Sequence, residues 1–392
     1  MTATPSVVVV GGGAVGLCTA FELTELGVTD VKVIEREQVA SGSSGLSVGI
    51  VETQYLDPLA IAIRVYSMEF FARLEREAGL QVTRNGYLRL AHDSADMDVF
   101  AASIVVQSEL GVTHPRLLDR GDVERLVPDM ACSDLVGGLF GPNDGYIDGH
   151  LYCTVLADML RDRGARVLPS AGLVNAESSA AGRHLLTTSQ GPLECDVVVN
   201  AAGGWAGKVG DLLGAPAAVL PQRHRALVAH LPRALDYLMP SVMDYIPASG
   251  RQGLYFRHET ARSMIAGLHT EDVLHDIVDP DGYPTGADTS YMAEVGELLS
   301  SRLPSLADAR LGNVWAGLYP ISPDGSPGVG PYRDRPDVVA AFGGGGSGLQ
   351  ASPGMGRIAA EWIVHGEPAT IPGAQVLVPD RPSLLETAVA RR

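Results

Sequence analysis

Cysteines, basic side chains and long apolar runs are all scarce in this sequence of 392 residues. The four cysteines, Cys18, Cys132, Cys153 and Cys195, include no CxxC pair and have no histidine at zinc-ligand spacing. This pattern favours reduced packing cysteines, and we expect no metal site. The sequence has 29 Lys and Arg residues but 46 Asp and Glu residues, which gives a formal charge of −17. General binding to nucleic acid or to an anionic membrane is disfavoured, because both need cationic patches.

No apolar stretch reaches the roughly 18 to 20 residues that a transmembrane helix needs. The N-terminal run "MTATPSVVVV" also lacks the basic segment and small-residue cleavage site of a signal peptide, so we expect a cytoplasmic protein. Internal repeats and low-complexity linkers are missing from the sequence as well. With 46% hydrophobic and 19% charged residues the composition is that of a globular protein. The length suggests about two domains or one large interleaved unit.

Glycine, in contrast, is abundant, and the 46 glycines cluster. The N-terminal segment predicts a buried four-valine strand, a glycine turn, an amphipathic helix to about Leu26 and a second strand that ends at Glu35. In the turn, Gly11, Gly13 and Gly16 fit GxGxxG, whose glycines permit a tight turn, close approach of a pyrophosphate and close helix–strand packing. Glu35 would accept hydrogen bonds from a ribose. The segment therefore predicts dinucleotide binding, and the alternative is a glycine turn that serves packing only.

The C-terminal segment "VVAAFGGGGSGLQASPGMGRIAAEWIVHGE" bears on the choice between NAD and FAD. It predicts a buried strand, a glycine turn over residues 343–348 and a helix from about Ser352. The N–H groups at a helix N-terminus favour an electron-rich partner, and in flavoproteins that partner is the pyrimidine end of the isoalloxazine. The segment favours FAD, although a second glycine turn with a packing role is the alternative.

Five ordered segments now indicate a family: the opening βαβ unit, "SGSSGLSVGI", "VVVNAAGGWAG", "WAGLYPISPDGSPGVG" and "GGGGSGLQASPGMG". In this order they resemble the FAD-dependent D-amino acid oxidase family, most of all its sarcosine oxidase, dimethylglycine dehydrogenase and glycine oxidase branch. The resemblance implies an α/β fold with a Rossmann-like FAD-binding domain built from residues 1–85, 147–215 and 315–392. It also implies an interleaved substrate domain of antiparallel sheet and helices, built from residues 86–146 and 216–314.

The intervening sequence is compatible with that division. Apolar residues recur at helical spacing over residues 61–79, and residues 86–91, 226–231, 253–259 and 263–270 are predicted as strands between Pro and Gly breaks. From about Pro372 the Pro-rich tail is expected to wrap the surface.

The resemblance also implies the cofactor contacts and the chemistry. A hydride is removed from a carbon next to an amine nitrogen and delivered to the flavin N5, leaving an imine that water hydrolyses, while protein groups orient the substrate. Family members with covalently attached flavin use a cysteine or histidine at positions that are Leu46 and Trp315 here, so noncovalent FAD is expected. The implied FAD contacts are Gly11, Gly13, Ala14, Val15, Gly16, Glu35, Arg36, Ser43, Ser44, Gly45, Leu46, Val174, Ala202, Gly203, Trp205, Gly345, Gly346, Ser347, Gly348, Leu349 and Gln350.

This chain departs from the family pattern at Glu52, where sarcosine oxidase-like enzymes place an arginine that holds the substrate carboxylate. A planar guanidinium suits a carboxylate, and a glutamate repels one. We therefore expect a substrate that lacks a carboxylate at that point or carries a cation there. Two alternatives stay open: the alignment is shifted by a residue or two, or Glu52 pairs with a protein cation such as Arg257.

Other departures concern oxygen and substrate. Ile265 stands where a lysine promotes oxygen reduction, which favours a dehydrogenase, and His269 matches an active-site histidine. The usual glycine-histidine-glycine is "GSG" at 346–348, and a carboxylate-holding lysine is Gln350. The substrate-site candidates are His269, Glu52, Tyr255, Arg257, Tyr319 and Gln350, with Tyr55 as a further cavity residue.

Together these observations predict an FAD-dependent oxidoreductase that oxidises a C–N bond of an amine or amino acid derivative other than simple sarcosine. The expected partners are a small amine or amino acid-like substrate and an electron acceptor, either oxygen or another carrier, and the chain is a possible homo-oligomer. Oxidation of a 2-hydroxy acid and an electron-relay subunit of a larger complex are the alternatives.

Overall fold

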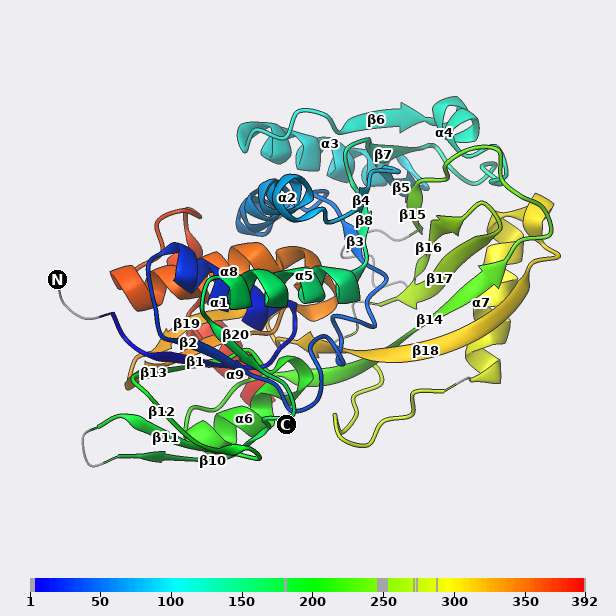
Figure 1. Ribbon diagram of the computed structural model, residues 1–392. Coiled ribbons are helices and arrows are strands. Elements are labelled where there is room, and N and C mark those ends of the chain that lie inside the picture. Colours follow the sequence, from blue (N-terminus) through cyan, green and yellow to red (C-terminus); the bar gives the residue numbers. More distant parts are fainter. Residues whose placement is uncertain are drawn as a thin grey trace.

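The computed structural model describes residues 4–179, 182–244, 253–270, 272, 274–286 and 288–390. Its two largest sheets are a six-stranded sheet with helices packed on it and an eight-stranded, mostly antiparallel sheet (Figure 1). The predicted α/β class with an interleaved antiparallel sheet is therefore confirmed. Each sheet takes its strands from segments far apart in the chain, so the two parts are interwoven.

The six-stranded sheet has the order β19-β20-β13-β1-β2-β9, with every neighbouring pair parallel except β19 and β20. Its strands are β1 (Val7–Val10), β2 (Val31–Ile34), β9 (Arg166–Leu168), β13 (Val197–Asn200), β19 (Gly328–Tyr332) and β20 (Arg335–Phe342). Side chains alternate between the faces of a strand, and both faces of this sheet are covered. Val7 and Val9 therefore enter one apolar cluster and Val8 and Val10 another, and none of the four is more than 5% exposed.

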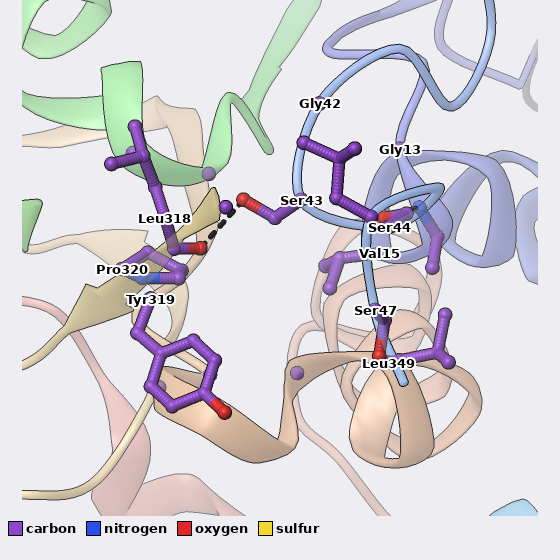
Figure 2. A pocket seen from close by; sticks show the side chains of 18 of the residues that line it. Gly13, Val15, Gly42, Ser43, Ser44, Ser47, Leu318, Tyr319, Pro320 and Leu349 are labelled. Atoms are coloured by element: carbon purple, nitrogen blue, oxygen red, sulfur yellow. Dashed lines mark hydrogen bonds between the residues drawn. The ribbon is translucent and has the colours of Figure 1, made fainter. Parts of the chain in front are cut away.

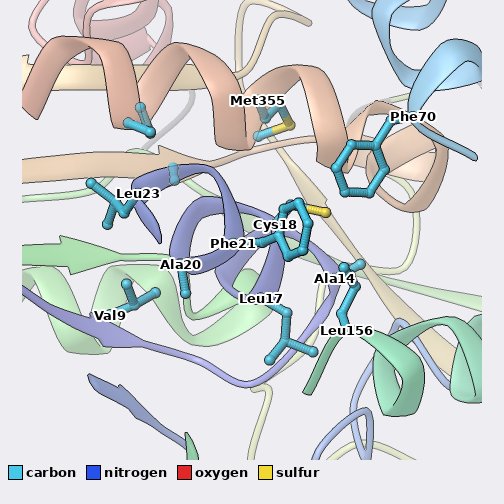
Figure 3. Close-up of a cluster of buried hydrophobic side chains, with 14 of the residues drawn as sticks. Val9, Ala14, Leu17, Cys18, Ala20, Phe21, Leu23, Phe70, Leu156 and Met355 are labelled. Carbon is cyan, nitrogen blue, oxygen red and sulfur yellow. The ribbon is translucent and has the colours of Figure 1, made fainter. Parts of the chain in front are cut away.

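Helices α1 (Ala14–Glu25), α5 (Gly149–Asp162) and α8 (Gly348–His365) lie on the Val7 and Val9 face of this sheet, and α2 (Pro58–Ala78) packs against α8 beyond them. Figure 3 shows Val9, Leu17, Phe21 and Met355 among the side chains of this buried apolar cluster. Helices α1 and α8 pack so closely that a Cβ at Gly356 would lie 2.7 Å from the backbone of Cys18. The N-termini of α1 and α8, at Ala14 and Gly348, line the same cavity.

The opposite face is covered by α6 (Ala206–Leu213) and by a three-stranded antiparallel sheet (Figure 1). The strands of this small sheet are β10 (Leu173–Ser178), β11 (His184–Thr188) and β12 (Gly191–Cys195). A second small sheet, of order β3-β8-β4, joins β3 (Ile50–Val51), β8 (Gly145–Ile147) and β4 (Val82–Thr83).

The eight-stranded sheet has the order β18-β14-β17-β16-β15-β5-β7-β6, and β15 and β5 are its parallel pair. Its strands are β5 (Tyr87–Ala91), β6 (Arg116–Asp119), β7 (Gly137–Gly141), β14 (Leu220–His230), β15 (Ser241–Asp244), β16 (Gly253–Thr260), β17 (Ser263–His269) and β18 (Arg310–Ile321). Helix α7 (Thr289–Arg302) shares an apolar cluster with one of its faces, and α3 (Ser94–Glu109) and α4 (Arg120–Leu126) pack near β6 and β7. Strand β18 continues without a break through residue 315, where the resemblance had led us to expect a domain boundary.

Alternation along β17 decides which side chains face away from α7. Met264, Ala266 and Leu268 belong to the apolar cluster that includes α7. Residues of the opposite parity, Ile265 and His269 among them, point to the other face of the sheet. All four predicted strand segments are confirmed as parts of β5, β14, β16 and β17, although β14 begins earlier than predicted, at Leu220.

Helix α8 begins at Gly348, about four residues before the predicted start, and it contains Pro353. Proline lacks the N–H that would bond the carbonyl four residues earlier. Here Ser352 Oγ donates a 2.7 Å hydrogen bond to that carbonyl, Leu349 O. The helix therefore continues through the proline, which the sequence pattern did not reveal.

The C-terminal tail is more ordered than predicted, because it forms the short helix η4 (Ala374–Leu377) and α9 (Pro382–Ala390). Leu384 is fully buried beside Phe342, and Arg381 makes a bidentate ion pair with Asp324. In the described part of the chain no helix is long and apolar enough to cross a membrane.

The four cysteines are free and buried, as predicted. Burial raises the pKa of the Cys18 thiol to about 12, so it is inert. No group of His, Cys, Asp or Glu residues suited to a metal occurs within the residues that the structure describes.

Candidate active site

A cavity of about 1170 Å³ runs from the N-terminus of α1 to one face of the eight-stranded sheet. It begins at the carboxyl ends of the parallel strands, where Gly11 follows β1, Glu35 follows β2 and Ala201 follows β13. Ligands of open α/β sheets bind at this edge. The predicted cofactor contacts that line the cavity are Gly11, Gly13, Ala14, Val15, Glu35, Arg36, Ser43, Ser44, Leu46, Ala202, Gly203, Trp205, Gly345, Gly346, Ser347, Gly348, Leu349 and Gln350.

Three predicted cofactor contacts do not line the cavity. Gly16 and Gly45 instead permit close backbone packing, because a Cβ would lie 2.0 Å from Gly11 O and 2.3 Å from Ala40 O, respectively. Val174 is 58% exposed, while the residues just before it, 171–173, line the cavity. The side chain of Val174 points away because positions alternate along β10.

The first turn of α1 forms a cradle of backbone N–H groups. Gly11 has φ of +118°, and a Cβ there would lie 2.4 Å from Ala201 O, so only glycine fits. The N–H of Ala14 donates a 3.0 Å hydrogen bond to Ser44 Oγ, and a Cβ at Gly13 would lie 3.1 Å from the same atom. Figure 2 shows Gly13, Val15 and Ser44 grouped at this point, opposite Leu318 and Tyr319.

The cradle fits a dinucleotide. Backbone N–H groups and the helix dipole favour a pyrophosphate, and side chains at Gly11 or Gly13 would narrow the space. Glu35 Oε2 accepts a 2.8 Å hydrogen bond from the N–H of Gly12, and Oε1 accepts one from Glu37 N–H, also 2.8 Å. These two hydrogen bonds fix the Glu35 carboxylate at the cavity wall.

A segment that the sequence analysis did not single out lines the cavity beside Arg36 and Trp205. Residues 280, 281, 283 and 285 line it. The Asp281 carboxylate accepts a 2.7 Å bond from Arg36 Nη1 and a 2.6 Å bond from Trp205 Nε1, and it also pairs with Lys208. The Arg36 guanidinium lies 4.7 Å from the Trp205 ring centroid. No sequence motif predicts this segment, since its contacts with Arg36 and Trp205 join residues far apart in the chain.

Glu52 lies at the other end of the cavity, and it is 2% exposed. Its Oε1 is 3.7 Å from Arg89 Nη2, and its Oε2 accepts a hydrogen bond from the N–H of Gln54. Arg89 also lines the cavity. The protein cation beside Glu52 is therefore Arg89, not Arg257, and β5 brings it there.

Arg257, a predicted substrate contact, does not line the cavity. Its Nε donates a 2.6 Å hydrogen bond to Val48 O, and its Nη1 bonds Glu259. The guanidinium carbon lies 3.9 Å from the Tyr146 ring centroid. Arg257 thus holds the loop before β3 in place, as a buried structural cation.

Gln350 connects the N-terminus of α8 to the Glu52 loop. Its Oε1 accepts a 2.9 Å bond from the N–H of Glu52, and its Nε2 donates a 2.9 Å bond to Tyr55 OH. The Arg64 guanidinium lies 3.7 Å from the Tyr55 ring centroid and donates to Ser347 Oγ at 2.6 Å. These contacts join the Glu52 loop and α2 to the glycine-rich segment at the start of α8.

His269, Tyr255 and Tyr319, three of the substrate-site candidates, line the cavity, and so does His224, which the sequence analysis missed. The His224 ring stacks on Tyr319 at 3.6 Å between centroids, and its Nε2 pairs with Gln222 Oε1. Burial, and then the charge of His269, hold the pKa of His224 well below its usual range, so the ring is neutral. The sequence offered little to find these residues. Arg89 is a polar residue inside the predicted strand 86–91, and His224 is a polar residue just before the predicted strand 226–231.

Leu46 and Trp315, which the resemblance matches to positions of covalent flavin attachment, both line the cavity. Trp315 Nε1 donates a 2.8 Å hydrogen bond to Leu46 O. Ile265 is buried on the strand that carries His269, but it is not part of the cavity wall.

Comparison with known proteins identifies the family. Residues 6–362 match the family model of the FAD dependent oxidoreductases (DAO), and the chain belongs to this family. It is 29% identical to mitochondrial dimethylglycine dehydrogenase of Mus musculus over 376 residues, covering 92% of this chain and 42% of that protein. The chain thus spans about two fifths of the length of that relative. It is 23% identical to glycine oxidase of Geobacillus kaustophilus, covering 94% of this chain and 95% of the relative.

The fold is similar to that of solved family structures. The crystal structure of L-proline dehydrogenase from P. horikoshii superposes with a TM-score of 0.84 at 24% identity, covering 97% of this chain and 98% of that one. The likeness extends over both sheets, since nearly the whole chain is covered.

Proposed function

We propose that this chain is an FAD-dependent oxidoreductase that oxidises a C–N bond of an amine or amino acid derivative. The observation that carries the proposal is one continuous cavity, which joins the dinucleotide cradle at α1 to a polar end lined by Glu52 and His269. The names of relatives support the reaction class: dimethylglycine dehydrogenase, glycine oxidase and L-proline dehydrogenase each act on an amine-bearing compound. The two sheets support a division into an FAD-binding and a substrate domain.

Bound FAD would supply the hydride acceptor. In this proposal the α1 cradle holds the pyrophosphate, Glu35 the ribose, and the N-terminus of α8 the electron-rich end of the flavin ring. Noncovalent binding is supported by Leu46 and Trp315, because neither side chain carries a nucleophile that bonds a flavin. Asp281, through Arg36 and Trp205, would keep the nucleotide end closed.

The substrate end would orient the amine rather than perform the redox step. Glu52 places a carboxylate in a poorly hydrated wall, where a cationic or hydrogen-bond-donating group of the substrate is favoured. Burial raises the pKa of Tyr255 well above its usual range, and burial likewise raises that of Tyr319, so both phenols stay neutral. With the neutral His224 they would bind the uncharged part of the substrate and exclude water from the reacting carbon.

Anaerobic mixing of the holoenzyme with amines, N-methyl amino acids, amino acids and 2-hydroxy acids tests the proposal. Loss of flavin absorbance with amines alone supports it. Bleaching by hydroxy acids only would indicate 2-hydroxy acid oxidation instead. Turnover only with an added protein would indicate an electron-relay subunit. Acid precipitation of the same sample should release FAD into the supernatant, and colour retained on the denatured chain would overturn noncovalent binding.

A further inference from the structure

The turn between β7 and β8 holds a carboxyl group that the proposed reaction does not use. Asp144 is fully buried, and a Cβ at Gly141 would lie 2.0 Å from its Oδ2, so this glycine leaves room for the carboxyl group. Gln54 Nε2 donates a 3.2 Å hydrogen bond to Asp144 Oδ2 and a 2.9 Å bond to Tyr87 O. The side chains of Asp144 and Gln54 are therefore in direct contact.

Each of these two side chains has an oxygen without a donor. Within the described part of the chain, Asp144 Oδ1 and Gln54 Oε1 are both buried and accept no hydrogen bond. Leaving buried acceptors unsatisfied is costly, and two such acceptors on touching groups cannot satisfy each other. A proton on Asp144 Oδ1 removes the conflict, because the acid then donates to Gln54 Oε1 while Gln54 Nε2 donates to Oδ2.

We propose that Asp144 is a positioning residue that carries a proton and forms a reciprocal acid–amide pair with Gln54, which leaves Glu52 as the ionised carboxylate beside Arg89. Gln54 transmits the effect, since its backbone N–H donates to Glu52 Oε2. The pair thereby fixes the loop that presents Glu52 to the cavity. The consequence for substrate binding rests on the proposed function, whereas the protonation state does not.

The surrounding charges support a neutral acid. Burial, and then the negative charge of Glu52, raise the pKa of Asp144 well above its usual value, against the opposing effects of the Gln54 hydrogen bond, the Arg89 charge and the Thr53 backbone N–H. Tyr87 also faces this group, and burial raises the pKa of its phenol, so it adds no charge near neutral pH. One guanidinium beside two ionised carboxylates would leave a net negative charge in a buried site, and protonation of the more buried one avoids it.

Infrared spectra of the holoenzyme test the protonation state directly. At neutral pH the wild type should show the C=O band of a protonated carboxylic acid that is missing from Asp144→Asn. The band should disappear as pH rises through the pKa of Asp144. Glu52→Gln should move that midpoint to lower pH, because it removes the neighbouring negative charge. A difference spectrum between wild type and Asp144→Asn without an acid band would overturn the proposal.

Thermal unfolding separates this role from ordinary packing. Asp144→Asn keeps one donor and one acceptor for Gln54, so its Tm near pH 7 should equal or exceed that of the wild type, whereas Asp144→Leu should lower Tm by several degrees. Asp324→Asn is the matched control, because Asp324 is ion-paired with Arg381, and this variant should lose stability. If Asp144→Asn is destabilised as much as Asp324→Asn, Asp144 is ionised and the proposal is wrong. Failure of the amine panel would instead contradict the proposed reaction and leave these spectra unaffected.

Discussion

Gln350 Oε1 accepts a hydrogen bond from the backbone N–H of Glu52 at 2.9 Å, across 298 positions of sequence. These are the two positions at which the family resemblance leads us to expect carboxylate-holding cations in related enzymes. Because the bond uses the Glu52 backbone, the side chain of residue 52 can be changed without removing it. A mutation of Glu52 can therefore remove the negative charge at the cavity without breaking the hydrogen bond that holds this part of the cavity wall.

Glu52→Gln keeps the shape of the side chain and removes its charge. We expect kcat/KM for the native substrate to fall roughly ten- to hundredfold, as for loss of one charge-assisted hydrogen bond of about 1.5 to 3 kcal/mol, with FAD content unchanged. Glu52→Arg should weaken that substrate further and admit small N-methyl amino acids. Steady-state kinetics with Glu177→Gln as an exposed control measure this. Efficient sarcosine turnover by the wild type, or a silent Glu52→Gln, would show that Glu52 has only a structural role.

Gly13→Val should yield folded apoprotein. A Cβ at Gly13 meets only Ser44 Oγ, at 3.1 Å, so the fold tolerates it while the added methyl groups fill the pyrophosphate cradle. Gly11→Val should fail to fold, because its Cβ would lie 2.4 Å from a carbonyl oxygen. The ratio of flavin to protein absorbance and circular dichroism report the two effects. A Gly13→Val protein with full FAD would place the cofactor elsewhere.

Asp281→Asn should speed FAD dissociation about two- to fivefold at low salt, the range for exposed ion pairs. Added salt should speed release from the wild type more than from the variant, since screening weakens the same contacts. Flavin fluorescence after dilution gives the rate, and Asp211→Asn, an exposed carboxylate on α6, is the control. Equal rates for all three proteins would mean that the segment does not hold the cofactor.

His92 should make stability pH-dependent. Its hydrogen bond to Asp244, at 2.7 Å, raises the pKa of His92 above its usual 6.5. The charged pair therefore stabilises the fold fully below about pH 6.5, and this contribution is lost as pH rises through the folded-state pKa. His92→Gln should lower Tm more at pH 5.5 than at pH 8.5, whereas the exposed His150→Gln should show little effect at either. A pH-independent loss would point to packing alone.

Local pattern was enough to predict the dinucleotide cradle. The four valines, the glycines at 11 and 13 and the acidic Glu35 lie within one βαβ unit, so hydrophobic periodicity and turn chemistry determine their arrangement. The antiparallel strands could be predicted for the same reason. Resemblance over five ordered segments supplied the family and the FAD site, which no single segment could have provided.

Tertiary structure alone decided which charges share the substrate end. Arg89 reaches Glu52 because β5 pairs with β15 and β7, and Asp144 reaches Gln54 through the turn after β7; no sequence pattern encodes those pairings. Arg257 was expected there and lies elsewhere: it shares a face of β16 with Tyr255, but its guanidinium is held by Val48 O and Glu259. The sequence by itself determined the βαβ unit with its cradle and the positions of the antiparallel strands, whose signals are local. The charge balance at the cavity depends on long-range packing, and only the folded chain establishes it.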